Sequence, residues 1–260
     1  MAEIKAIIFD QDGVIIDTER DGHRVAFNKT FKEFGFDFEW DVNYYHELLQ
    51  VAGGKERMRH HLHTKGFGRE VKPEEEDELI KAMHKRKTGI FIELIKEGAL
   101  PLRPGIKRIM KEAMNRGLKV GICTTSNERT AHAVAYEILK DIKFDFVLAG
   151  DVVKKKKPDP EIYLLALEKG GLKAEECIVV EDSRNGLLAA KAAGMNVVVT
   201  TNYYTEKEDL READITITCL GDSDGEKGEL KQGGKGINYN GVLGIDQLIA
   251  YFLKVKKQSY

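Results

Sequence analysis

Short apolar runs recur along most of the chain, and amphipathic stretches separate them. The runs are rich in Ile and Val and read AIIF (6–9), KVGIC (119–123), DFVLA (145–149), IVV (178–180), NVVVT (196–200) and DITIT (214–218). Continuous β-branched runs are typical of strands buried on both faces of a parallel sheet. The stretches between them, such as 105–116 and 183–193, have the spacing of helices that cover such a sheet. The alternation predicts an α/β fold with a doubly wound, Rossmann-like parallel sheet.

One region lacks strand-like runs and is helical in pattern instead. It carries helix-like patterns near 22–34, 55–64 and 74–97 and an aromatic segment at 34–45. We therefore expect an α/β core formed by 1–17 and 101–260, interrupted by a helical domain at 18–100. The aromatic side chains of this segment are expected to fill the core of the helical domain, with a platform for a ligand as the alternative.

A glycine-rich and charged segment, 221–236, precedes the last helical pattern at 244–255. Its few apolar residues predict a mobile surface loop.

The composition and charge of the chain indicate what kind of molecule it binds. The formal net charge of the 260 residues is −2, so no overall positive field favours nucleic acid. No apolar stretch approaches the roughly 18 residues of a membrane span, and the first residues do not resemble a targeting signal. The three cysteines are odd in number and widely spaced, which argues against disulfides and a zinc cluster. We expect a cytoplasmic protein that acts on a small molecule.

Polar clusters follow the predicted strands at four places. They read FDQDG (9–13), CTTSN (123–127), KKKKPDP (154–160) and VVEDS (179–183). Ligands of open parallel sheets bind beyond the carboxyl ends of the strands, so these clusters are expected to converge.

The first cluster places Asp10 at a strand end and Asp12 two positions later. Two neighbouring carboxylates can divide roles, one as nucleophile and metal ligand and the other as proton donor and acceptor. An ordinary Asp-rich turn is the alternative for this motif taken alone.

The second and third clusters offer groups that bind phosphate. Thr124, Thr125, Ser126 and Asn127 precede a predicted helix, whose free N–H groups and neighbouring hydroxyls suit an anion, although helix capping alone would explain Ser126 or Asn127. Lys157 is expected to neutralise charge that develops on a transferring phosphate. The lysines at 154–156 are expected to be a solvated basic run.

The fourth cluster contributes Glu181 and Asp182. Together with Asp10, these carboxylates suit Mg²⁺, a hard cation that prefers oxygen ligands. A helix cap at Asp182 or Ser183 is the alternative. The clusters follow one another along the chain as an Asp pair, hydroxyl residues, a lysine and an acid pair. Together they supply a nucleophile, a general acid, a metal site and phosphate ligands, which is the set required for phosphoryl transfer.

The motifs DxDGV, a strand that ends in Thr, Lys-Pro and Glu-Asp resemble the four motifs of the haloacid dehalogenase (HAD) superfamily. The resemblance implies that Asp10 forms an aspartyl-phosphate and that Asp12 is the acid and base. It also implies that Thr124 and Lys157 hold the phosphoryl group. Asp10, the backbone carbonyl of Asp12, and Asp182 would bind Mg²⁺, with support from Glu181. Because an acid stands two places after the nucleophile, a phosphatase or phosphomutase is implied, and 18–100 resembles the helical cap of this superfamily.

The segments 17–28 and 53–59 are similar to the CbbY group, whose members hydrolyse xylulose-1,5-bisphosphate and are related to beta-phosphoglucomutase. The resemblance implies substrate contacts for Glu19, His23, Gly54, Lys55 and Arg57. Alternatively, Lys55 and Arg57 only solvate a helix of the cap. Caps of this kind often occur in monomers. Three functions follow: a sugar-phosphate or sugar-bisphosphate phosphatase, a phosphosugar mutase, and a non-catalytic binding module.

Overall fold

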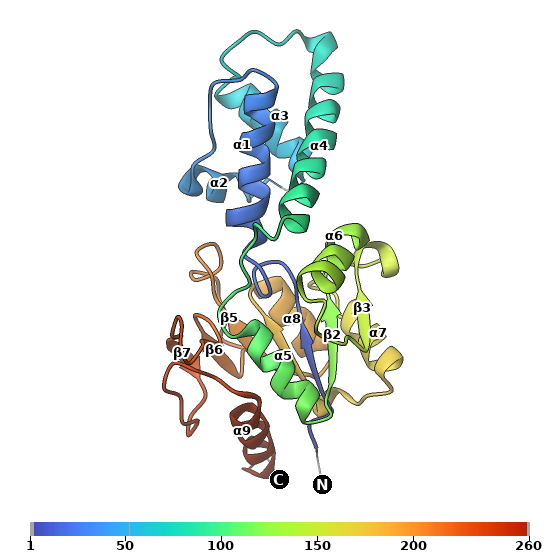
Figure 1. Cartoon of the computed structure of the whole chain (residues 1–260), viewed down its shortest axis with the longest axis vertical. Helices are drawn as coiled ribbons and strands as arrows, with labels where there is room; N and C mark the ends of the chain where they lie inside the picture. Colours follow the sequence, from blue (N-terminus) through green and yellow to red (C-terminus); the bar gives the residue numbers. More distant parts are fainter. Residues whose placement is uncertain (1–2, 52, 259–260) are drawn as a thin grey trace. The chain divides into compact units, whose positions relative to one another are not determined.

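The computed structural model describes residues 3–51 and 53–258 (Figure 1). The chain forms two compact units. One consists of 1–17 and 101–260 and is called the core unit below, and the other consists of 18–100 and is called the helical unit.

The core unit is built on one sheet with the strand order β3-β2-β1-β4-β5-β6-β7. Its strands are β1 (Ala6–Phe9), β2 (Lys119–Cys123), β3 (Phe146–Leu148), β4 (Cys177–Glu181), β5 (Asn196–Thr200), β6 (Ile215–Ile217) and β7 (Leu230–Gly233). The first six are mutually parallel, and β7 pairs antiparallel with β6. The order of the parallel strands is that of the doubly wound Rossmann-like folds, so the predicted fold class is confirmed.

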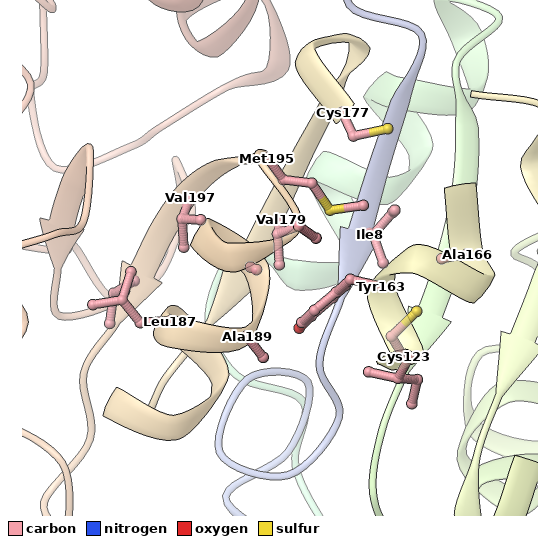
Figure 2. Packing of buried hydrophobic residues seen from close by; sticks show 14 of the residues in the cluster. Ile8, Cys123, Tyr163, Ala166, Cys177, Val179, Leu187, Ala189, Met195 and Val197 are labelled. Carbon is pink, nitrogen blue, oxygen red and sulfur yellow. The ribbon is translucent and has the colours of Figure 1, made fainter. Parts of the chain in front are cut away.

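Helices cover the sheet on both faces. They are α5 (Ile106–Asn115), α6 (Glu128–Ala133), α7 (Glu161–Gly170), α8 (Arg184–Ala192) and α9 (Ile245–Gln258), with single turns η2 (Val134–Ile138), η3 (Gly150–Val152) and η4 (Ala174–Glu176). Figure 2 shows Ile8 and Val179 of the central strands packed against Tyr163 of α7 and Ala189 of α8. Since neighbouring strand residues point to opposite faces, Ile7 and Phe9 face the other side, where α5 contacts β1.

The glycine-rich segment differs from the prediction. A mobile surface loop was expected at 221–236, but this segment contains β7, and Arg108 of α5 fixes its beginning. The Arg108 guanidinium donates to the carbonyl oxygens of Leu220 at 3.2 Å and Gly221 at 2.6 Å, and the backbone N–H of Gly105 donates to the Asp222 carboxylate at 2.8 Å. The strand escaped prediction because its side chains are all exposed and none is β-branched.

The helical unit has an aromatic core. Its elements are η1 (Thr18–His23), α1 (Arg24–Glu33), α2 (Val42–Leu48), α3 (Gly54–Thr64) and α4 (Pro73–Lys96). Phe27 and Phe31 of α1 each lie 4.7 Å from Trp40, between ring centres, and Trp40 and Tyr45 are fully buried. The aromatic segment thus supplies core residues. In the described part of the chain, no helix combines the length and hydrophobicity needed to cross a membrane.

Replacement of Phe31 by Ala tests this aromatic core. Phe31 is fully buried against Trp40 and Phe38, and the loss of a buried phenyl ring costs about 3–5 kcal/mol of stability. Because Trp40 is the only tryptophan of the chain, its fluorescence during urea denaturation reports the unfolding of the helical unit.

Lys32→Ala is the matched control, because its side chain is exposed on the same helix, and we expect a change within about 0.5 kcal/mol. Equal effects of the two substitutions would contradict the assignment of Phe31 to the core.

Candidate active site

Two carboxylate pairs meet at the centre of the sheet edge. Asp10 directly follows β1. Glu181 is the last residue of β4, the strand that pairs with β1. The order of the strands reverses direction beside β1, the position at which crevices open in folds of this kind. The structure brings together one oxygen from each of Asp10, Glu181 and Asp182, all within 4.8 Å of one another.

Lys157 ties this cluster together. Its ammonium donates to Asp10 Oδ1 and to Glu181 Oε1, both at 2.6 Å, and to the carbonyl oxygen of Cys123 at 3.0 Å. Burial opposes the charge of this ammonium, but the adjacent Asp10 and Glu181 carboxylates outweigh burial and raise the pKa of Lys157. Lys157 therefore carries a positive charge inside the cluster.

Asp12 is held separately, by hydroxyl groups from the segment after β2. Thr124 Oγ1 donates to Asp12 Oδ2 at 3.3 Å, and Ser126 Oγ donates to the same oxygen. The backbone N–H of Ser126 in turn donates to Thr124 Oγ1 at 3.1 Å. Two hydroxyls expected near a phosphate thus contact the expected acid and base.

The remaining expected residues of this segment are more exposed. Thr125 and Asn127 are exposed, and the Asn127 side chain caps α6 by accepting from the Arg129 N–H at 2.9 Å. Asn127 therefore caps the helix, as the alternative interpretation expected. Its contact with the substrate stays a prediction. In the third cluster, the side chains of Lys154–Lys156 are exposed, whereas only 7% of the Lys157 side chain is exposed.

The carboxylate cluster fits a divalent cation. Burial raises the pKa of Asp10 and of Asp182, and the Asp10 and Glu181 carboxylates add repulsion at Asp182. A cation among these oxygens would relieve the repulsion and restore the charged form of both groups. The donor set consists of carboxylate oxygens, which suits Mg²⁺ rather than a softer metal.

Three supporting residues escaped the sequence analysis. The Asn202 amide donates to Asp182 Oδ2 at 2.8 Å, and the Tyr163 hydroxyl donates to Glu181 Oε1. Gly186 of α8 lies against the Glu181 carboxylate, where a Cβ atom would overlap it. Asn202 comes shortly after the strand NVVVT, just as the other polar clusters follow their strands. This position in the sequence could have identified it. Tyr163 and Gly186 carry no comparable signal.

Two of the expected substrate residues of the helical unit, Glu19 and Arg57, form a hydrogen-bonded group around Tyr45. The Tyr45 hydroxyl donates to Glu19 at 2.5 Å, and Arg57 donates to the Tyr45 hydroxyl at 3.3 Å and to the Val51 carbonyl at 2.9 Å. The Arg57 side chain is only 14% exposed, so this residue does more than solvate a helix surface.

His23, Gly54 and Lys55 lie on other parts of the same unit. His23 Nδ1 lies 2.9 Å from the ammonium of Lys87, and the His23 ring packs 4.0 Å from that of Phe91. Burial, followed by the charges of Lys87 and Arg57, holds the pKa of His23 well below its usual value, so the ring is neutral and can accept from Lys87. Gly54 and Lys55 begin α3, with Gly54 close to His84.

The comparison with known proteins assigns the family. The model of the haloacid dehalogenase-like hydrolases matches residues 4–194, and the chain belongs to this family. The chain is 46% identical to the CBBY-like protein of Arabidopsis thaliana over 86% of its own length and 72% of that protein. It is 32% identical to the phosphorylated carbohydrates phosphatase of Thermotoga maritima, with 74% and 82% of the two chains covered.

A solved structure is similar to most of the chain. A mutant CbbY from Rhodobacter sphaeroides, in complex with xylulose-(1,5)bisphosphate, is 38% identical, with a TM-score of 0.66 over 82% of this chain and 93% of that one. The expected resemblance to the HAD superfamily and the CbbY group is confirmed. The chain is an enzyme of the phosphatase type within this family.

Gly186→Ala tests the packing of α8 against Glu181. In most helix interiors this change stabilises a protein by about 0.5–1 kcal/mol. Here the added methyl group overlaps the Glu181 carboxylate, and we expect a loss of about 1–3 kcal/mol from overpacking, measured by thermal unfolding.

Gly89→Ala on α4 is the control, since the nearest atom to its new methyl group is the end of the Arg86 side chain at 3.6 Å. This variant should be as stable as the wild type or more so. Stabilisation by both substitutions would show that Glu181 is not fixed against α8.

Proposed function

We propose that this protein is a magnesium-dependent phosphatase that hydrolyses a sugar phosphate or sugar bisphosphate through an aspartyl-phosphate on Asp10. The observation that carries the proposal is the buried group of Asp10, Glu181 and Asp182 around the Lys157 ammonium. It combines a carboxylate nucleophile with positive charge and with oxygen ligands for a hard cation.

Asp10 is the proposed nucleophile. One of its oxygens is held by Lys157 at 2.6 Å, which fixes the carboxylate plane and leaves the second oxygen for the phosphorus atom. In the first step a bond forms between this oxygen and phosphorus, and the bond from phosphorus to the ester oxygen breaks. Lys157 remains beside the reacting group and balances the charge that develops on the phosphoryl oxygens.

Asp12 is the proposed general acid and base. The two hydroxyls that contact Asp12 Oδ2 fix its side chain in place for proton transfer. Protonated Asp12 gives its proton to the departing alkoxide. It then takes a proton from the water that attacks the aspartyl-phosphate, which regenerates Asp10 and releases inorganic phosphate.

Asp10, the backbone carbonyl of Asp12, and Asp182 are the proposed ligands of Mg²⁺, with Glu181 in support. When bound, the ion supplies positive charge that brings the negatively charged phosphate next to the negatively charged nucleophile. Asn202 keeps the Asp182 carboxylate in place through its amide. Thr125, Ser126 and Asn127 are proposed to contact the phosphate of the substrate.

The proposed substrate class rests on the relatives and on the charge of the helical unit. A CbbY relative was crystallised with xylulose-(1,5)bisphosphate, which carries two phosphates. Arg57 and Lys55 of the helical unit are cations that suit a second phosphate. We propose that Glu19, His23 and Gly54 also contribute to substrate recognition, through hydroxyl contacts and close backbone approach.

Asp10→Asn is the direct test of the nucleophile. An amide cannot attack phosphorus in this way, so phosphate release should fall to background while circular dichroism stays that of the wild type. Asp224→Asn, a change of the same kind at an exposed aspartate far from these motifs in sequence, should retain activity. Substantial turnover by Asp10→Asn would refute the mechanism.

Metal removal and a substrate panel test the rest of the proposal. Phosphate release from sugar mono- and bisphosphates should be lost with EDTA and restored by excess Mg²⁺, and a ketopentose bisphosphate should be the preferred substrate. Phosphorylated hexoses are followed in parallel for isomerisation. Isomerisation without phosphate release would indicate a mutase, and undiminished activity in EDTA would contradict the metal site.

A further inference from the structure

Arg103 makes an unusual set of contacts in the core unit. It lies near the start of the second core segment, where its backbone N–H donates to the Ile15 carbonyl at 2.9 Å and the adjacent Leu102 bridges to Ile16. The first and second core segments therefore run side by side at Arg103, directly after the DQDG motif.

The Arg103 guanidinium binds backbone carbonyls from three separate loops. It donates to Thr200 O at 3.0 Å, Thr201 O at 2.6 Å and Thr218 O at 2.7 Å, and also to Gly13 O. Gly13 follows β1, Thr201 follows β5, and Thr218 follows β6. The guanidinium reaches these carbonyls and the Thr200 hydroxyl through two terminal nitrogens, whereas a lysine ammonium is a single nitrogen with three N–H donors and can satisfy fewer of these acceptors.

Two of these acceptors are adjacent to residues of the candidate active site. Gly13 follows Asp12, and a Cβ atom at Gly13 would overlap the Asp182 carboxylate, so the Gly13 turn lies directly against Asp182. Thr201 precedes Asn202, whose amide holds Asp182 Oδ2 at 2.8 Å. The carboxylate of Asp182 thus lies between two segments whose backbones are both tied to Arg103.

Thr200 adds a third connection. Its hydroxyl accepts from Arg103 at 3.1 Å and lies 3.5 Å from the backbone carbonyl of Glu181, to which it donates. Arg103 therefore reaches both members of the Glu181–Asp182 pair, in each case through one intervening residue.

We propose that Arg103 is a positioning residue for the magnesium site, which fixes the loops on either side of Asp182 without touching the metal or the substrate. The inference rests on the proposed function, because it assigns Asp182 to the metal. Outer contacts that orient metal ligands are worth roughly 10–100-fold in metal affinity.

The test is calorimetric titration of the full-length protein with Mg²⁺, which needs no turnover. Arg103→Met removes all the guanidinium donors and should raise the dissociation constant for Mg²⁺ by about tenfold or more. Arg103→Lys keeps the charge but offers one nitrogen in place of two for the same five acceptors, and should give an intermediate value. The lysine variant carries the test if the methionine variant does not fold.

Arg108→Met is the matched control. Arg108 also donates to loop carbonyls, those of Leu220, Gly221 and Leu243, but none of these adjoins the carboxylate cluster in sequence. This variant should lose thermal stability and keep the wild-type affinity for Mg²⁺. An equal loss of affinity in Arg108→Met would show that general loosening of the fold, and not positioning by Arg103, weakens the site.

The outcomes separate this inference from the proposed function. If the wild type binds Mg²⁺ and the folded Arg103 variants bind it equally well, the inference is overturned and the proposed function stands. If the wild type does not bind Mg²⁺, the proposed metal site fails, and the role of Arg103 fails with it.

Discussion

The candidate active site depends on one buried ion-pair network, in which Lys157 joins Asp10 to Glu181. Buried carboxylates repel one another and resist ionisation, and the side chains of Lys157 and Glu181 are 7% and 1% exposed. An ammonium at 2.6 Å from each of two carboxylates offsets part of this cost. A divalent cation would offset more of it by favouring the charged forms of Asp10 and Asp182, so the proposed metal site and this network depend on the same carboxylates.

The fold determines why this network forms where it does. Parallel strands end at one edge of the sheet, so Asp10 and Glu181, far apart in sequence, are neighbours through the pairing of β1 with β4. The helices α7 and α8 complete the arrangement from one face. Tyr163 of α7 donates to Glu181, and Gly186 of α8 leaves room for its carboxylate.

The parallel strands and the central polar residues could be predicted from sequence, because strands buried on both faces must be continuously apolar and their polar ends stand out. The strands β1, β2 and β5 occupy the predicted residues, and the other parallel strands differ by one residue at each end. The helix α2 was not predicted, since the aromatic segment 34–45 lacks helical periodicity, although Asp41 caps the helix by accepting from the Tyr44 N–H. Strand β7 is too exposed and too rich in polar residues to show a strand pattern.

The supporting contacts were beyond sequence reasoning for a different reason. Arg103 binds carbonyl oxygens, which every residue possesses, so nothing in the identity of Gly13, Thr201 or Thr218 marks them as its partners. In the helical unit, the link from Glu19 through Tyr45 to Arg57 likewise joins residues of three separate elements. Residue types that carry chemistry are visible in a sequence, whereas the contacts that orient them depend on the folded backbone.

The proposed mechanism requires that Asp10 becomes phosphorylated during turnover. It can be tested by intact-protein mass spectrometry of the Asp12→Asn variant, mixed with Mg²⁺ and an aryl phosphate and quenched in acid. The aryl oxide is a good leaving group and departs without a proton from residue 12, so the first step still proceeds. Without the base that activates water, the intermediate should accumulate. We expect the mass to increase by one phosphoryl group, located at Asp10 by peptide analysis and removed by hydroxylamine. Phosphate release by this variant with no phosphoenzyme at any time, or a phosphoryl group on another residue, would contradict the account.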